Sequence, residues 1–350
     1  MHLKTTLSVL AIAAVATMAQ NKAYSGAELY TLEEFGYGKY EARMKMAAAS
    51  GTVSSMFLYQ NGSEKNDGRA WVEVDIEVLG KAPNQFQSNI ITGNAAKQIT
   101  SEKHHTVNPA ANEEFHTYGI EWTPDYVRWT VDGVEMRKTV KGENDPKNQV
   151  DALKNGLNGI QQGLRFNIWS SESEAWVGSF DESKLPLFQF INWVKAYKYT
   201  PGQGPNGSDF TLEWTDNFDS FDSGRWGKGD WTFDGNRVDL TKQNIYSRDG
   251  MLILALTRKG QENFNGQVPQ DAAGDAEYKN GTTPASSSSA QDNPPSSSSE
   301  FNPFSSSSMT DAIRPLRAQT LNKEIRGTVN AKGARVNPNN KANYQVDFNF

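Results

Sequence analysis

Three carboxylic acids at alternate positions are the clearest chemical feature of the sequence. Glu73, Asp75 and Glu77 alternate with Val74 and Ile76. In an extended strand, residues two apart share a face, so the three carboxyls project together while the apolar residues anchor the opposite face in a core. Acids are poor strand formers and repel one another at this spacing, which disfavours them in an inert surface strand. The pattern indicates a functional site, with a solvated acidic face or a cation site as the alternatives.

Paired carboxyls of this kind are suited to cleaving a glycosidic bond. One carboxyl donates a proton to the leaving oxygen and the other acts as nucleophile or base, with a retaining pair roughly 5–5.5 Å apart. The Cα atoms of Glu73 and Glu77 are about 13 Å apart along a strand, so the long side chains must lean toward each other. The spacing leaves retaining and inverting geometries open. Asp75 is placed to raise the proton affinity of a neighbour and to orient the nucleophile through a shared proton.

The elements that must position these acids are strands. Period-two alternation runs from about residue 24 to residue 257, as in residues 40–46, 72–78 and 164–168, and residues 127–131 lead into the hairpin turn Asp132-Gly133. Many short strands separated by Gly, Asn and Asp predict an all-β protein, a curved β-sandwich or jelly roll. The alternation also predicts one sheet face on the core and one facing a cleft.

Composition narrows the classes of function. The 350 residues include 9 Trp, 12 Tyr and 17 Phe, carry a formal net charge of −6 and contain no Cys. The negative charge argues against nucleic acid as the partner, and the absence of Cys removes disulfides, thiolate metal sites and Cys nucleophiles. Residues 201–208 spell G-x-G-x-x-G, but Pro205 and the strand-like sequence that follows favour a loop over a dinucleotide site.

Residues 71–77 (WVEVDIE) resemble the W-D-E-I-D-I-E motif of glycoside hydrolase family 16, in particular its β-1,3-1,4-glucanases or lichenases, with Val72 in place of the usual Asp. Residues 37–43, 115–124, 131–133 and 166–169 are also similar to that family. The resemblance spans about residues 24–258. It implies a jelly roll with a concave substrate groove, with Glu73 as nucleophile, Glu77 as general acid/base and Asp75 as assistant.

Aromatic and amide residues of matching parity surround the predicted site. Aromatic planes stack on pyranose faces, while amides and Arg bind hydroxyls. Core packing is the alternative for each single aromatic, above all for Phe57. The resemblance implies a substrate-binding set that comprises Phe57, Tyr59, Asn61, Gln87, Asn89, Arg165, Asn167, Trp169, Trp176 and Trp231.

The order of segments departs from most of the family. A segment like residues 226–257 usually precedes the part that resembles residues 24–41, whereas here it follows residue 199. The chain therefore resembles a circular permutant joined near residues 201–208, similar to the permuted lichenase of a fibre-degrading bacterium. Such a permutation leaves the site intact where the original termini lie close together.

The sequence predicts four segments. Residues 1–19 have a basic start, an apolar run and small residues at their end, which predicts a signal peptide and a secreted or periplasmic bacterial protein without a membrane-spanning segment. Residues 20–265 are the predicted catalytic domain, and residues 266–308, with three runs of four Ser, a flexible linker. Residues 309–350, with seven Lys or Arg against three Asp or Glu, are a basic tail interpreted as contacting the cell surface or the secretion machinery.

The resulting hypothesis is a monomeric endo-acting licheninase that hydrolyses mixed-linkage β-1,3-1,4-glucan with retention and needs no cofactor for catalysis. The resemblance also implies a structural Ca²⁺, held mainly through carbonyl oxygens by Asn192, Asn217 and Gly250, with Asn192 where the family often has Asp. Two alternatives stay open: an endo-β-1,3-glucanase or other β-glycan hydrolase of the same family, and a non-catalytic carbohydrate-binding module. The intact acid triplet argues against the second alternative.

Overall fold

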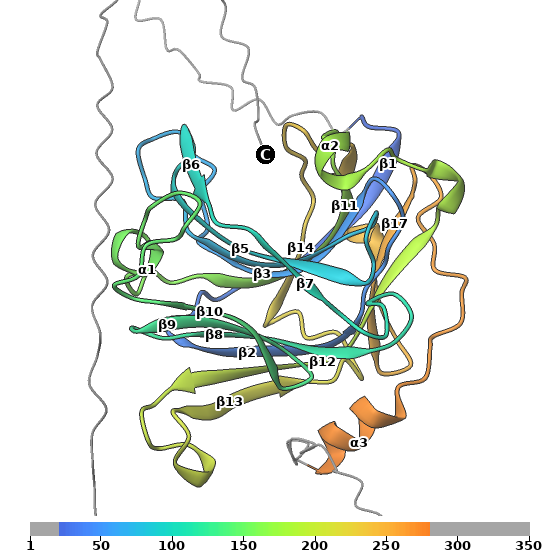
Figure 1. The fold of residues 1–350 in the computed structure, drawn as a ribbon. Coiled ribbons are helices and arrows are strands. Elements are labelled where there is room, and N and C mark those ends of the chain that lie inside the picture. The colour runs from blue at the N-terminus through green and yellow to red at the C-terminus, as the bar shows by residue number, and fades with distance from the viewer. Residues whose placement is uncertain (1–20, 281–350) are drawn as a thin grey trace, which may run out of the picture. The chain divides into compact units, whose positions relative to one another are not determined.

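The computed structural model describes residues 21–280, and strands dominate them (Figure 1). The predicted signal peptide, the serine-rich part of the predicted linker and the basic tail lie outside the described residues. No helix within residues 21–280 is long and apolar enough to cross a membrane. The described chain confirms the predicted all-β jelly roll.

One curved layer carries the acid strand. Its strands lie in the order β14, β1, β11, β3, β4, β5, and both β6 and β7 pair with β5 (Figure 1). All of these pairs are antiparallel. The strands of this layer, called the groove sheet below, are β1 (Tyr24–Thr31), β3 (Thr52–Tyr59), β4 (Glu73–Leu79), β5 (Gln85–Asn94), β6 (Lys97–Thr100), β7 (Lys103–Thr106), β11 (Gly163–Ser170) and β14 (Trp226–Lys228).

The second layer lies below the groove sheet in Figure 1 and forms the convex side. Its order is β10, β9, β8, β2, β12, and β12 pairs along one edge with both β13 and β17. The strands of this convex sheet are β2 (Gly38–Lys45), β8 (His116–Trp122), β9 (Tyr126–Val131), β10 (Val134–Val140), β12 (Leu187–Tyr199), β13 (Phe210–Asp216), β16 (Ile245–Arg248) and β17 (Met251–Arg258).

Strand β1 links the two layers. Its first residues pair with β17 of the convex sheet and run parallel to β15 (Val238–Leu240), while its later residues pair with β11 and β14 of the groove sheet. Segments from both ends of the described chain therefore meet at β1. The remaining elements are the short helices α1 (Ala152–Asn155), α2 (Glu174–Val177), η1 (Glu182–Lys184), η2 (Pro205–Gly207) and η3 (Lys242–Asn244), and the longer α3 (Ala272–Asn280).

The apolar residues at alternate positions of the predicted strands form the core between the two sheets. Val74 and Ile76 of β4 are fully buried, and so are Phe166 of β11 and Trp129 of β9. The Trp129 indole N–H crosses the core and donates to the backbone carbonyl of Asp75 at 2.9 Å. The strand that carries the acids is thus held by hydrophobic burial on its inner face and by a hydrogen bond from the opposite sheet.

Two turns behave as the sequence predicts. Asp132 and Gly133 close the β9–β10 hairpin with φ of 50° and 76°. Positive φ at both central residues is the conformation that a type I′ turn requires. Residues 201–208 form the loop of the β12–β13 hairpin, where the amide of Thr200 donates to the Asp209 carbonyl at 2.7 Å. No α-helix follows this loop, so the G-x-G-x-x-G spelling marks a turn.

The chain beyond residue 266 departs from the predicted flexible linker. Helix α3 contacts β12, and Asp271 just before it is 7% exposed. Arg43 of β2 donates to both carboxylate oxygens of Asp271 at 3.0 Å. The Asn192 amide donates to Asp271 at 3.0 Å and to Asp275 at 3.1 Å. Ordered packing therefore continues past the predicted boundary. The alternation of apolar residues does not reveal it, because this segment is held by buried polar contacts.

Candidate active site

Strand β4 places the three predicted acids on the exposed face of the groove sheet. Antiparallel pairing aligns side chains of the same face across neighbouring strands. Asp75 lies between Phe57 of β3 and Asn89 of β5. Arg165 of β11 lies opposite Phe57 and so extends the same row. The register thus assembles four predicted site residues from four strands into one line across the sheet.

Two further rows flank this line. Glu77 lies between Ser55 and Gln87, and Asn167 lies beyond Ser55. Glu73 lies opposite Tyr59 in the other row. The site residues predicted on β3, β4, β5 and β11 therefore lie on one face of the sheet, as their alternate positions in the sequence indicate.

Glu73 sits among donors that favour its charged form. The Trp71 indole N–H donates to Glu73 Oε2 at 2.7 Å. Burial raises the pKa of Glu73 to about 7, while the bond from Trp71, a hydrogen bond with Asp75 and the positive charge of Arg165 act in the opposite direction. A carboxyl that ionises near neutral pH and has a donor fixing one oxygen is suited to act as a nucleophile.

Glu77 holds its proton more tightly. Burial, and then the negative charge of Glu73, raise the pKa of Glu77 to about 8, although the Gln87 amide donates to Glu77 Oε2 at 2.8 Å and favours the ionised form. Glu73 therefore ionises at a lower pH than Glu77. This division suits one nucleophile and one proton donor.

Asp75 is the most confined of the three acids. It is 2% exposed, and its Oδ2 accepts no hydrogen bond from an N–H or O–H donor within the described residues. Burial and the charges of Glu73 and Glu77 raise the pKa of Asp75 well above its ordinary range. A protonated Asp75 donates toward Glu73 and stabilises its carboxylate, which is the geometry of a shared proton.

A fourth acid, Glu28 of β1, belongs to the site and was missed by sequence reasoning. Glu28 is 4% exposed, lies opposite Asn167 and forms an ion pair with Arg165. Burial raises the pKa of Glu28, and the Arg165 charge opposes that rise. The signal that could have revealed Glu28 is that it is the single acid in β1. The pair holds the Arg165 guanidinium at the groove.

Aromatic rings surround Arg165 at one end of the groove. The guanidinium lies 4.9 Å from the ring centre of Tyr59, 5.3 Å from that of Tyr30 and 5.9 Å from that of Trp231. Arg165 also donates to the side-chain oxygen of Asn61. Tyr59, Asn61, Arg165 and Trp231 thus lie together as the resemblance implies, and Tyr30 adds a ring that sequence reasoning did not name.

A second aromatic cluster lies at the other end. The Trp169 ring centre is 5.8 Å from that of Trp176, which comes from α2 rather than from a strand, and 5.1 Å from that of Phe233. Phe233 is 39% exposed and was not identified from sequence, because it lies in the irregular loop between β14 and β15. Trp176 donates to Gln87 Oε1 at 3.3 Å, which connects this cluster to Glu77.

Three predicted binding residues are largely enclosed. Phe57 is 8%, Asn89 5% and Asn167 7% exposed. Asn89 accepts from the Ser101 amide at 2.9 Å, and Asn167 accepts from the Ser55 hydroxyl at 2.6 Å. These side chains are packed at the surface of the sheet beside the acids, and the partly exposed rings flank them.

The predicted calcium ligands converge on the convex sheet. Register pairs Val194 with Asp216 and Ile191 with Leu252, which places Asn192, Asn217 and Gly250 near one another along the β12 edge. An added Cβ on Gly250 would lie 3.3 Å from Asp219 Oδ1. Carbonyl oxygens beside this carboxylate fit a hard cation. Residues 21–280 contain no group of three or more His, Cys, Asp or Glu able to hold a metal.

A β-sandwich with paired carboxyls among aromatic side chains on one sheet face is the arrangement of a glycoside hydrolase. The family model described as glycosyl hydrolases family 16 matches residues 4–180. A beta-glucanase of Fibrobacter succinogenes is 67% identical over 358 aligned residues, which cover 99% of each chain. The chain therefore belongs to glycosyl hydrolase family 16.

More distant relatives match part of the chain. A beta-glucanase of Brevibacillus brevis is 34% identical over 195 residues, covering 55% of this chain and 66% of the relative. The solved structure of a Bacillus licheniformis beta-glucanase is 30% identical, covers 47% of this chain and 68% of that chain, and aligns with a TM-score of 0.38.

Proposed function

We propose that this protein is an endo-acting hydrolase of mixed-linkage β-1,3-1,4-glucans that retains the anomeric configuration. The observation that carries the proposal is the acid triplet of β4, whose three carboxyls lie on one sheet face in register with Tyr59, Phe57 and Gln87 of the neighbouring strands. The beta-glucanases among the relatives support a β-glucan substrate. The resemblance of residues 71–77 to the lichenase motif supports mixed linkage.

In the proposed reaction, Glu73 attacks the anomeric carbon while Glu77 donates its proton to the departing glycosidic oxygen. Asp75 stabilises the Glu73 carboxylate before attack. Glu77, now ionised, then takes a proton from water, and that water displaces Glu73 from the covalent glycosyl intermediate. Two inversions at one carbon retain its configuration.

Aromatic residues at both ends of the groove support endo action. Along the strand direction, Tyr59 lies in the row of Glu73, whereas Trp169 lies in the row of Leu79, beyond Glu77. Rings on both sides of the reacting carboxyls suit a polymer that passes through the groove.

The test is a reducing-sugar assay on lichenan, laminarin and carboxymethylcellulose side by side, with the anomer of the first product read by NMR. We expect lichenan to be the preferred substrate and the β-anomer to form first. Preference for laminarin would replace the mixed-linkage proposal by a β-1,3-glucanase. An α-anomer would discard the retaining mechanism.

We also propose that the chain acts as an exported monomer and that Asn192, Asn217 and Gly250 hold a structural Ca²⁺. The oxygen-rich edge of β12 supports the metal proposal. A bound Ca²⁺ would tie the loops before β17 and after β13 to β12, remote from the acids. Chelation should therefore lower the melting temperature and leave the pH dependence of turnover unchanged.

A further inference from the structure

Strand β10 contains an irregularity that turns a charged residue into the core. Register pairs Glu135 with Thr130. The next pair is Arg137 with the buried Trp129, so Met136 is an extra residue in β10. Such a β-bulge re-aims the side chain that follows it. Regular pairing would place Met136 opposite Trp129 and Arg137 on the outer face. The bulge therefore puts an arginine beneath the groove sheet where an apolar residue was available.

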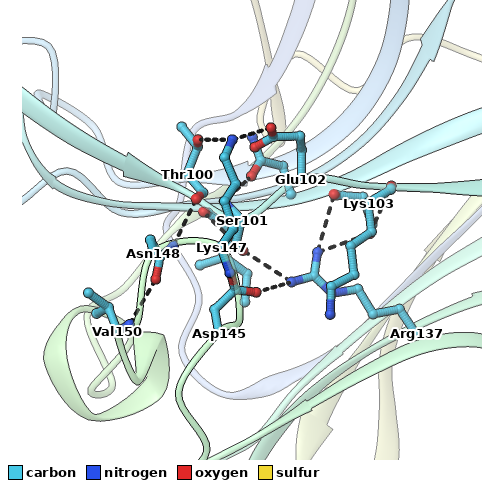
Figure 2. Close-up of polar contacts among 12 residues, drawn as sticks. Thr100, Ser101, Glu102, Lys103, Arg137, Asp145, Lys147, Asn148 and Val150 are labelled. Carbon is cyan, nitrogen blue, oxygen red and sulfur yellow. Dashed lines mark hydrogen bonds and ion pairs between the residues drawn. The ribbon is translucent and has the colours of Figure 1, made fainter. Parts of the chain in front are cut away.

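The burial of Arg137 is costly. Arg137 is 5% exposed, and burial lowers its pKa to about 10, although the charges of Asp145 and Glu102 oppose that change. The ion pair with Asp145 spans 3.8 Å (Figure 2), and Arg137 Nε makes no hydrogen bond within residues 21–280. An apolar residue in such a place is often as stabilising as a buried ion pair, or more so. Folding stability alone therefore does not explain the arginine.

The first contact of Arg137 leads to the row of Asp75. One guanidinium nitrogen donates to the backbone carbonyl of Ser88 at 3.2 Å and to the Ser88 hydroxyl at 3.1 Å. This carbonyl belongs to the peptide that joins Ser88 to Asn89, and Asn89 lies opposite Asp75. Arg137 thus fixes the backbone of the residue that faces Asp75 across the sheet.

A second contact reaches the side chain of Asn89. The other terminal guanidinium nitrogen donates to the Ser101 hydroxyl at 3.1 Å (Figure 2), and the Ser101 amide donates to Asn89 Oδ1 at 2.9 Å. Figure 2 also shows Lys147, from the loop after β10, paired with Glu102. This pair fixes the β6–β7 turn that carries Ser101. Asn89 is therefore held at both its backbone and its side chain.

A third contact reaches Asp75 itself through Trp129. The Arg137 guanidinium lies 4.5 Å from the ring centre of Trp129. The Trp129 indole N–H donates to the Asp75 carbonyl at 2.9 Å. A buried cation over the ring favours one orientation of the indole and so of its hydrogen bond. Three contacts of one side chain thus converge on Asp75 and its neighbour on β5.

We propose that Arg137 is a positioning residue that holds Asp75 from the core side and so keeps the Asp75 carboxyl beside Glu73. Arg137 contacts none of the three carboxyls, so it acts through Ser88, Ser101 and Trp129. The inference rests on the proposed function, in which Asp75 stabilises the Glu73 carboxylate before attack.

The proposal predicts the direction of a change in pH dependence. Burial raises the pKa of Glu73, and the hydrogen bond with Asp75 opposes that rise. Displacement of Asp75 should therefore raise the pKa of Glu73, so the carboxylate needed for attack is lost at a higher pH. The other charged or titratable side chains that face Glu73 should keep their places: Glu28, Tyr59, Glu77 and Arg165. The basic limb, set by Glu77, should therefore stay.

The test measures kcat, KM and the pH dependence of kcat/KM for Arg137→Met on whichever β-glucan the wild type cleaves. We expect kcat to fall roughly tenfold, as a small displacement of a catalytic group allows, with KM within about twofold of the wild type. The acidic limb should move to higher pH. Arg137→Lys, which keeps the charge but not the planar fork of donors, should recover part of kcat.

A double-mutant cycle tests whether Arg137 acts through Asp75. Asp75→Ala already removes the hydrogen bond to Glu73. Adding Arg137→Met to that variant should therefore lower kcat by less than about twofold. A further loss as large as that of Arg137→Met alone would show a general structural role and overturn the proposal.

Arg128→Met is the matched control, because Arg128 precedes Trp129 on β9 and donates to Glu121 on the outer face of the convex sheet. It should leave kcat and both limbs unchanged. If Arg137→Met does not fold because Asp145 is left unpaired, the double variant Arg137→Met/Asp145→Asn takes its place. An acidic limb that stays at the wild-type pH in the folded variant would overturn the proposal. A wild type that prefers laminarin would contradict the proposed function and leave this comparison of variants valid.

Discussion

Glu73 and Glu77 are chemically identical residues that their neighbours make different. Glu73 receives an indole hydrogen bond and faces the Arg165 guanidinium, whereas Glu77 has the Gln87 amide and faces the negative charges of Glu73 and Glu102. The environment therefore lowers the proton affinity of Glu73 relative to that of Glu77. The first is available as a nucleophile at a pH at which the second still holds its proton.

This division predicts different chemical rescue of the two alanine variants. Azide can replace the missing acid/base of Glu77→Ala by attacking the covalent intermediate, and should give a β-glycosyl azide. In Glu73→Ala, azide attacks in place of the nucleophile and should give an α-glycosyl azide. NMR of the products of an activated aryl glycoside distinguishes them, and Lys103→Ala serves as a control that forms no azide adduct beyond the wild-type level. The opposite pairing would exchange the assigned roles.

Sequence parity predicted most of the groove, because a strand fixes which side chains share a face. Alternation assigned Phe57, Tyr59 and Arg165 to a face of their strands, and the family resemblance selected them as substrate-binding residues. Glu28 was missed because it stands alone among apolar residues, and its ion pair with Arg165 bridges residues 137 apart in sequence. Phe233 was missed because no periodicity governs an irregular loop.

At the scale of elements, residues 271–277 form a clasp on the convex sheet. Asp271 bridges Arg43 of β2 and Asn192 of β12. Lys195 of β12 pairs with Glu277 at 3.4 Å. Gly274 is required there, because an added Cβ would lie 2.2 Å from Asp271 Oδ2. The clasp joins two neighbouring strands to a segment that the sequence assigns to a linker.

The clasp predicts a difference between two truncations. A chain ending at residue 280 should keep the melting temperature and activity of the full chain. A chain ending at residue 266 should lose roughly 1–3 kcal/mol of folding free energy, because the hydrogen bonds that Arg43 and Asn192 donate to Asp271 are lost. Denaturant unfolding monitored by Trp fluorescence measures this difference. Asp271→Ala in the longer chain should reproduce most of the loss, and equal stability of the two truncations would show that the clasp contributes nothing.

The segment order has a physical counterpart at β1. The Lys259 amide donates to the Ala23 carbonyl at 3.0 Å, and Tyr24 pairs with Arg258. The two chain positions that an unpermuted relative would join are therefore neighbours in space. Residues 201–208 lie in a hairpin loop, where opening the chain removes few contacts.

We therefore expect a reordered chain to fold. It would consist of residues 209–266, a flexible Gly/Ser linker and residues 23–200. Its matched control is the original order ending at residue 266, since both chains lack the clasp. Circular dichroism and lichenan hydrolysis within about threefold of the control would support the permutation, because a short flexible linker changes closure entropy little. A reordered chain that does not fold, next to a folded control, would show that the present junction is structural.

At the scale of the whole molecule, the sequence predicted the sandwich because strands such as β2 alternate between buried and partly exposed residues. It could not predict how β1 leaves one sheet for the other, since that depends on partners more than 200 residues away in the chain. The placement of α2 beside the groove depends on the same long-range packing. Local pattern thus determines the strands, and contacts distant in sequence determine their arrangement.

The same burial that prepares the acids for catalysis costs folding free energy. The pKa of Glu77 is about 8 in the folded chain against an ordinary value of 4.5. Because the folded state binds this proton more tightly, the contribution of Glu77 to stability is complete below about pH 4.5 and is lost as the pH rises through about 8. Glu73, with a pKa of about 7, acts in the same direction.

Replacing Glu77 by Gln should therefore make the protein inactive on polymers and more resistant to alkaline unfolding. The amide keeps an oxygen to accept from Gln87 and cannot ionise in the buried site. We expect Glu77→Gln to exceed the wild type in unfolding free energy by roughly 2 kcal/mol or more at pH 9, and to approach it at pH 5, where the wild-type carboxyl is protonated. Thermal or urea unfolding at both pH values measures the difference. Glu143→Gln, at an exposed acid in a turn, should follow the wild type at both pH values. A Glu77→Gln variant that loses as much stability as the wild type between pH 5 and pH 9 would mean that Glu77 ionises without penalty, and would remove the reason for assigning it the proton donor's role.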